Sequence, residues 1–193
     1  MKTIIKYELV INEALRSALN YDTPDEQINE FIRFFGKHIG SDRIYIFEDC
    51  DEKHVTKNTY EWCADGIVPE IHELQNVDMD IIGWWYQAFG SEKNIIITDI
   101  EQIKDEHRES YNLLKAQNVK NLVVCPIRYK DEIKGFFGVD NPPESDTLGL
   151  TTFLDMIGTL LISLLKLRNS FTKSNKEAML SSYSSLSSIY ISM

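Results

Sequence analysis

The sequence has few cysteines, and no two of them have the spacing of a redox or zinc motif. Its three cysteines are Cys50, Cys63 and Cys125, and an odd count of widely separated thiols argues against a disulfide framework. His54 lies close enough to Cys50 to share a metal with it, but no second ligand pair accompanies them. We therefore predict no metal centre, name no cofactor, and expect a reducing, cytoplasmic location.

Basic blocks and an apolar leader are also missing. The formal net charge of −10 and the lack of clustered lysine and arginine argue against a nucleic-acid partner. Glu8 and Glu13 interrupt the segment in which a signal peptide would need an unbroken apolar core. Residues 148–167 approach the length of a membrane span, but Asp155 lies near their middle. We expect no span in this chain.

Catalytic signatures are equally scarce. The sequence has no phosphate-binding glycine loop, no Ser-His-Asp spacing and no evident pair of catalytic carboxylates. The 193 residues suffice for one well-buried domain with additional terminal elements. We therefore expect this chain not to be an enzyme by itself, although a longer protein that contained it could be one.

What the sequence does contain is a strong β-hairpin pattern. Two apolar runs, 122–127 and 133–139, flank a polar stretch at 129–132, which predicts a hairpin with a loop of four or five residues. Phe136 and Phe137 are adjacent, so their side chains point to opposite faces and the sheet should be covered on both sides. Gly135 and Gly138 predict a bulge or a close approach by another group.

Helical patterns lie at both ends of the chain. Residues 3–19 predict one helix, and a capping box of Thr23 and Glu26 begins a second that should end at Gly40. Residues 146–168 predict a long helix with two apolar stripes, of which one can cover the sheet and the other can contact a second subunit.

The order of the remaining elements indicates the fold class. Strands are predicted at 43–48, 55–63 and 94–98, helices at 80–89 and 107–117, and an irregular candidate lid at 64–78. This order predicts an α+β sandwich with a central antiparallel sheet of five to six strands. Terminal helices should cover one face and crossover helices the other, with a pocket between the sheet and the crossover.

Aromatic and polar side chains near this expected pocket form the candidate site. Tyr60, Trp62, Trp84 and Trp85 could form an aromatic wall for a planar or cationic ligand, or could simply fill the core. Asp140 and Asn141 could bind polar ligand atoms or cap a turn. The candidate ligand-binding residues are Arg43, Tyr45, Tyr60, Trp62, Trp84, Trp85, Asp140 and Asn141.

Arg43 also has a structural alternative. It could face an anion, but pairing with Asp42, Glu61 or Asp140 is the favoured expectation, because a guanidinium in a strand commonly pairs with a neighbouring carboxylate. The residues therefore leave its role open between ligand binding and structure.

Three motifs in order resemble a GAF domain: DRIYIFE at 42–48, NTYEWC at 58–63 and VCPIRYKDEIKGFFGVDNP at 124–142, followed by the long helix. The resemblance is greatest to the bacterial GAF sensors that precede GGDEF diguanylate cyclase domains. It covers residues 22–168 and implies a GAF/PAS-like sandwich with a regulatory small-molecule pocket. It also implies homodimerisation through the terminal helices. The signature of cyclic-nucleotide-binding GAF domains and the Cys-His context of the bilin-binding branch are not evident.

The resemblance implies an organisation for the whole chain. Residues 1–21 would be an N-terminal signalling or dimerisation helix, 22–168 the GAF domain, and 169–193 a linker or the start of a following output domain. The expected function is small-molecule sensing that controls an attached diguanylate cyclase through helix repacking. Two alternatives remain: a dimerisation module with a vestigial pocket, and an enzyme resembling the GAF-fold free methionine sulfoxide reductases.

Overall fold

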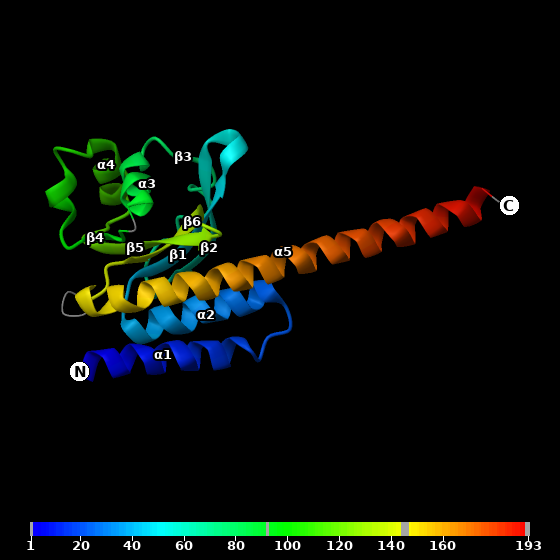
Figure 1. Ribbon diagram of the computed structural model, residues 1–193, viewed down its shortest axis with the longest axis horizontal. Coiled ribbons are helices and arrows are strands. Elements are labelled where there is room, and N and C mark those ends of the chain that lie inside the picture. Colours follow the sequence, from blue (N-terminus) through cyan, green and yellow to red (C-terminus); the bar gives the residue numbers. More distant parts are fainter. Residues whose placement is uncertain (1, 92, 144–146, 192–193) are drawn as a thin grey trace.

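The computed structural model describes residues 2–91, 93–143 and 147–191 and shows a six-stranded antiparallel sheet between two helical layers (Figure 1). The strand order is β3-β2-β1-β6-β5-β4, which places β1 and β6 at the centre. This arrangement confirms the predicted α+β sandwich. The strands are β1 (Arg43–Cys50), β2 (Val55–Cys63), β3 (Val77–Asp78), β4 (Ile95–Ile97), β5 (Leu122–Tyr129) and β6 (Glu132–Asp140).

Three helices cover one face of the sheet: α1 (Lys2–Ala18), α2 (Pro24–Ile39) and α5 (Thr147–Ile191). The predicted capping box of α2 is confirmed. The Thr23 hydroxyl accepts from the Glu26 amide at 3.3 Å, and the Thr23 amide donates to the Glu26 carboxylate at 3.1 Å. Gly40, with φ of 75°, ends the helix in the left-handed conformation.

The core on this face is formed by apolar side chains of all three helices and of four strands. Gly36 of α2 allows β2 to approach closely, since a Cβ there would lie 2.3 Å from the Trp62 ring. The fully or almost fully buried members with the largest side chains are Tyr7, Phe31, Phe35, Ile28, Ile32, Ile44, Ile46, Ile127 and Phe137.

The crossover elements cover the opposite face: α3 (Gly83–Gly90), a 3-10 turn η2 (Ile100–Ile103) and α4 (Arg108–Ala116). A further 3-10 turn, η1 (Asp51–Lys53), joins β1 to β2. Phe136 is the centre of this second core, with its ring stacked on Phe47 at 4.7 Å and edge-on to Trp85 at 5.5 Å. Phe136 and Phe137 therefore lie on opposite faces, as predicted.

Three sequence expectations differ from the structure. The β5–β6 loop contains only Lys130 and Asp131, because Tyr129 and Glu132 pair across the strands. Both loop residues have positive φ, 49° and 66°, as a two-residue hairpin turn requires, without the usual Asn-Gly signature. The short strand β3 was not predicted, and α5 continues past residue 168 to Ile191.

Helix α5 projects beyond the body of the domain (Figure 1), and a side-chain contact joins it to the sheet near the point where it extends past the sheet. Arg168 of α5 donates from Nη1 and Nη2 to the two carboxylate oxygens of Glu48 on β1, each at 2.7 Å. The Tyr60 hydroxyl accepts from Arg168 at 3.2 Å and donates to Asp25 of α2.

Among the described residues, no helix combines the length and apolarity needed to cross a bilayer.

The Arg168–Glu48 contact should contribute measurably to stability, because it is bidentate and its side chains are only 16% and 22% exposed. Arg168→Lys cannot reproduce the two parallel hydrogen bonds and should lower the free energy of unfolding by about 1 to 2 kcal/mol. Urea unfolding followed by circular dichroism measures this change.

The control is Lys173→Met on the same helix, which removes an exposed pair with Glu177 at 4.0 Å. Its effect should stay within about 0.5 kcal/mol. Equal effects of the two substitutions would contradict a stabilising role for the Arg168 contact.

Candidate ligand-binding site

A buried ionic cluster lies where β1 begins. Arg43 Nη1 is 3.1 Å from Asp140 Oδ2 on β6, and Arg43 Nε is 3.5 Å from Glu61 Oε1 on β2. All three side chains are at most 4% exposed. Arg43 also donates from Nη2 to the Val68 carbonyl at 2.8 Å. The favoured expectation that Arg43 pairs with neighbouring carboxylates is confirmed for Glu61 and Asp140.

The same cluster holds an irregular stretch, residues 64–76, over the sheet; we call it the covering segment. Glu61 Oε2 accepts hydrogen bonds from the amides of Glu70 at 2.9 Å and Ile71 at 3.1 Å. Leu74, near the end of the segment, is one of the residues that line a cavity between this segment and the sheet. The backbone of this irregular segment is thus fixed by a buried carboxylate instead of by regular secondary structure.

A cavity of about 40 Å³ lies between the sheet, the covering segment and the crossover helices. One water molecule needs roughly 10 to 15 Å³ of such space, so the cavity has room for about three waters or a molecule of similar size. The residues that line it are Arg43, Tyr45, Phe47, Asn58, Glu61, Leu74, Val77, Ile82, Trp85, Leu113, Leu114, Gln117 and Phe136.

A second, polar hollow of about 100 Å³ lies beside the first. Arg43 and Gln117 border both spaces, so they lie between the buried cavity and this outer hollow. Asp140 and Asn141 border the outer hollow only. The two spaces are therefore adjacent, with the Arg43 side chain between them.

Two of the predicted aromatic residues line the cavity. Trp85 is 3% exposed and closes one side, and the Tyr45 ring lies across β6. Gly138 makes this position of Tyr45 possible, because a Cβ at residue 138 would lie 2.1 Å from the ring. The close approach predicted from the glycines of this strand is therefore confirmed.

The other predicted aromatic residues lie elsewhere, so the structure does not bring together a four-membered aromatic wall. Trp84 stacks on His107 at 4.0 Å and donates from Nε1 to the Ser110 hydroxyl at 3.0 Å, which joins α3 to α4. Tyr60 and Trp62 face the terminal helices on the opposite side of the sheet. Alternation along β2 places these two side chains away from the crossover.

Asn141 holds loops together beside the outer hollow. Its Oδ1 accepts from the amides of Lys120 at 2.7 Å and Asn121 at 3.2 Å, and its Nδ2 donates to Asp42 at 2.7 Å. Its φ of 50° is one that asparagine tolerates better than most residues. These contacts match the turn-stabilising alternative for this residue.

Asn58 and Glu61 line the cavity but were not among the predicted site residues. Simple alternation along β2 would place Asn58 on the same face as Tyr60. The pairing of β1 with β2 shifts after Ile46, so that Phe47 pairs with Asn58 and Thr59 is left as an extra residue. This bulge turns Asn58 to the cavity face, and no local feature of the sequence marks it.

Burial dominates the electrostatics of the cluster. It raises the pKa of the Asp140 carboxyl to about 7, although the Arg43 guanidinium and a hydrogen bond with the Tyr45 side chain both favour the ionised form. Burial also raises the pKa of Tyr45 well above its ordinary value. The phenol of Tyr45 is therefore neutral near neutral pH and can donate a hydrogen bond.

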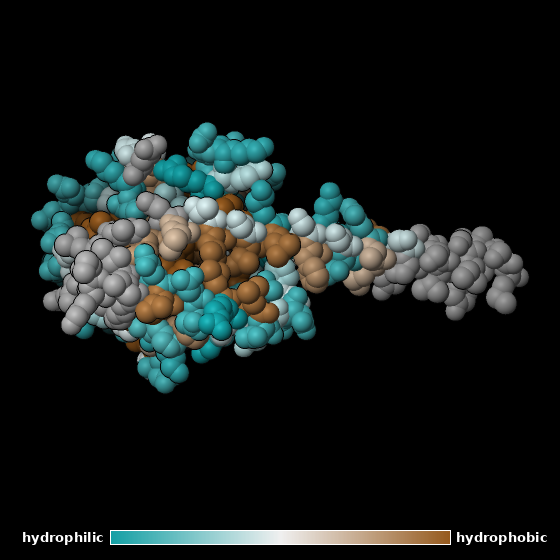
Figure 2. All heavy atoms as spheres, turned by 60° about the horizontal axis from the view of Figure 1, so that its bottom comes forward, coloured by the Kyte–Doolittle hydropathy of each residue, from teal (hydrophilic) through white to brown (hydrophobic). Residues whose placement is uncertain are grey.

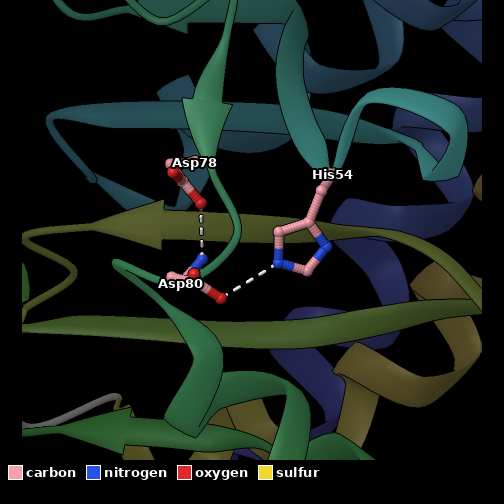
Figure 3. Close-up of side chains that lie close together, drawn as sticks. All are labelled: His54, Asp78 and Asp80. Carbon is pink, nitrogen blue, oxygen red and sulfur yellow. Dashed lines mark hydrogen bonds and ion pairs between the residues drawn. The ribbon is translucent and has the colours of Figure 1, made fainter.

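One group of possible metal ligands occurs among the described residues, outside the cavity. His54, Asp78 and Asp80 offer ligand atoms within 4.8 Å of one another, and Figure 3 shows His54 beside Asp80. His54 Nε2 lies 3.0 Å from Asp80 Oδ1, and the Asp80 amide donates to Asp78. All three side chains are exposed, and Cys50, which could have shared a metal with His54, is not part of the group.

The fold and its cavity define a class of α+β sandwich in which crossover helices enclose a space against the sheet. The chain belongs to the GAF domain family, whose sequence profile matches residues 23–165. The sequence is 24% identical over 127 residues to the methanogenesis regulatory histidine kinase FilI of Methanothrix harundinacea (strain 6Ac). That match covers 64% of this chain and only 14% of the kinase.

Solved structures show the same fold at low sequence identity. A far-red absorbing protein with bound biliverdin superposes with a TM-score of 0.66 at 12% identity, over 83% of this chain and 99% of the other. Free methionine-R-sulfoxide reductase from Neisseria meningitidis, in complex with its substrate, gives 0.62 at 9% identity, over 86% and 92%. Identities this low establish the shared fold alone.

The raised pKa of Asp140 predicts a pH dependence of stability. Because the folded pKa of about 7 exceeds the value of 3.8 for an exposed aspartate, the protonated carboxyl favours the folded state. The contribution of Asp140 to the free energy of unfolding should be complete below about pH 4 and should be lost as the pH rises through about 7. Denaturation of the wild type and of Asp140→Asn across this range measures it.

Carbon-13 NMR of the Asp140 carboxyl gives an independent check. We expect a midpoint near pH 7. A midpoint near the ordinary aspartate value, with no pH-dependent difference between the two proteins, would contradict this account.

Proposed function

We propose that this chain is the small-molecule-sensing domain of a signalling protein and regulates an attached output domain. The observation that carries the proposal is the buried cavity beside Arg43, which is bordered by polar atoms that no described residue satisfies. In the proposed organisation, residues 22–168 form the sensor, residues 1–21 an N-terminal signalling helix, and residues 169–193 a connection to the output domain.

Strand β1 offers a direct route from the cavity to the last helix. On one face of β1, Arg43 and Tyr45 border the cavity. On the other face, Glu48 binds Arg168 of α5. A ligand that shifts β1 would therefore change the free energy of the contact with α5. Signalling requires that the ligand binds one arrangement of the helices more tightly than the other.

The size of the cavity favours a small ligand. A bilin-binding neighbour has the same fold, but the space here has room for about three waters. None of the three cysteines lines the cavity, so no thiol is placed for covalent attachment of a cofactor within it. A soluble metabolite of a few heavy atoms fits the space better than a large planar chromophore.

The small volume also supports a second candidate, a dimerisation module with a vestigial pocket. An enzyme of the methionine sulfoxide reductase type has less support. Cys125 is buried and donates to the Leu154 carbonyl, and burial raises the pKa of the Cys63 thiol, which lowers its reactivity. No disulfide bond joins any of the three cysteines in the described structure.

Helix α5 is the proposed dimerisation element. Figure 2 shows apolar side chains that follow α5 over the body of the domain and past its edge. Leu167 and Phe171 are 52% and 42% exposed and lie four residues apart, on one side of the helix. A paired helix of this kind could connect to a diguanylate cyclase, as the sequence resemblance favours, or to a histidine kinase, as the similarity to FilI favours.

A thermal-shift screen of metabolites, nucleotides and small amides tests ligand sensing. A ligand at about 100 times its Kd should stabilise the wild type by about 2.7 kcal/mol, which raises the melting temperature by roughly 5 to 10 °C. Asn58→Leu should lose the response, because its amide borders the cavity. Trp84→Phe should keep it, because Trp84 is not among the cavity-lining residues. Intact dimers with no stabilising compound would favour the vestigial pocket.

Light scattering during size-exclusion chromatography tests the role of α5. The wild-type chain should elute as a dimer, and Phe171→Glu should shift it to a monomer, because a charge would be buried at the helix pair. The matched control is Val68→Glu in the covering segment, where the side chain is 70% exposed and the dimer should persist. A wild type that is monomeric at high concentration would exclude this route of signalling.

A further inference from the structure

Three cavity-lining residues from three different elements each carry a buried polar atom that has no hydrogen-bond partner among the described residues, although one of these atoms, Arg43 Nε, also lies 3.5 Å from Glu61 Oε1. Two are donors, Arg43 Nε on β1 and Trp85 Nε1 on α3, and one is an acceptor, Asn58 Oδ1 on β2. The residues are 3%, 3% and 1% exposed, so bulk solvent does not satisfy them. Buried polar groups in folded proteins nearly always have partners, so this concentration of exceptions at one cavity points to a bound molecule.

The orientation of the Asn58 amide follows from its neighbour. Asn58 Nδ2 donates to Glu61 Oε1 at 3.1 Å. An ionised carboxylate only accepts hydrogen bonds, so the NH₂ group must point to Glu61 and the carbonyl oxygen must be the unpaired atom. The site therefore presents two donors and one acceptor to its occupant.

The charges around the cavity disfavour an anionic ligand. The guanidinium of Arg43 is already neutralised by Glu61 and Asp140, at 3.5 and 3.1 Å. An anion in the cavity would meet the Glu61 carboxylate and no unmatched positive charge, and it would lose its hydration in a buried space.

A cationic ligand is disfavoured for a related reason. Asp140 borders the outer hollow and not this cavity, and the Glu61 oxygens already accept from Asn58, Glu70 and Ile71. A cation would have to displace these contacts, which hold the strands and the covering segment. An uncharged occupant avoids both costs.

Size and wall chemistry narrow the class further. The space of about 40 Å³ accepts a molecule of only a few heavy atoms, and Val77, Ile82 and Phe136 give it apolar walls. A carbonyl oxygen has two lone pairs and can accept from two donors, and an adjacent N–H can donate to the Asn58 carbonyl. An amide group carries both functions side by side.

We propose that the cavity binds a small uncharged molecule with an amide-type group, whose carbonyl accepts from Arg43 and Trp85 and whose N–H donates to Asn58. This ligand class rests on the proposed sensing function and specifies its chemistry. Small primary amides, ureas and lactams belong to the class, whereas carboxylates, nucleotides and bilins do not.

Three isosteric probes test the charge and the donor pattern at constant size: acetamide, acetate and acetamidinium. The readout is the indole N–H signals of the three tryptophans in ¹H–¹⁵N spectra of the full chain. Trp85→Phe assigns the Trp85 signal by its loss. Acetamide should shift this signal and bind at least about fivefold more tightly than either charged probe, the factor expected for one hydrogen bond.

The signal of Trp62 provides the internal control, because Trp62 packs against the terminal helices on the opposite face of the sheet and does not border the cavity. It should not move, and its unchanged position also reports an intact fold in the variants. Asn58→Leu should abolish the acetamide response of Trp85.

Two results would overturn the inference. Tighter binding of acetate or acetamidinium would show that the ligand class is wrong while the sensing function stands. No response of the Trp85 signal to any probe, with the fold intact, would show that the cavity does not take a small molecule of this class. The proposed function itself fails only if the metabolite screen also finds no stabilising compound.

Discussion

The buried contacts of Arg43 with Asp140 and Glu61 determine how the rest of this domain is arranged. They join three neighbouring strands, β2, β1 and β6, at one end of the sheet. Through Glu61 and the Val68 carbonyl they also fix the covering segment, which has little regular structure of its own. Ionised groups at this depth are stable only when their hydrogen-bonding capacity is met, so the cluster, the segment and the cavity form one interdependent unit.

Strand β1 lies between the proposed ligand-binding cavity and the terminal helices that would carry the signal. One face of the strand borders the cavity, and the other face is packed on the terminal helices and bound to Arg168. Closely packed layers transmit small displacements, because close-packed protein interiors have low compressibility. The position of Glu48 on the strand that carries Arg43 gives a physical basis for communication between ligand and helix, without a hinge or a separate lid domain.

Local patterns predicted much of the fold, whereas the site depended on non-local pairing. The capping box at Thr23 and the adjacent Phe136 and Phe137 each specify their structure through near neighbours, and both were predicted correctly. Asn58 reaches the cavity only because the pairing of β1 with β2 shifts by one residue, which alternation along β2 does not reveal. The short loop at Lys130 is set by strand register in the same way.

Native mass spectrometry of the chain, purified without heat or denaturant, tests the central claim most directly. The account predicts that the wild type retains an uncharged molecule of a few heavy atoms, and that Asn58→Leu and Trp85→Phe lose it while Trp84→Phe keeps it. Retention of the same molecule by all of these variants would place its site outside the Arg43 cavity. A wild type without any bound molecule, at the same mass as Asn58→Leu after correction for the substitution, would contradict occupancy of the cavity.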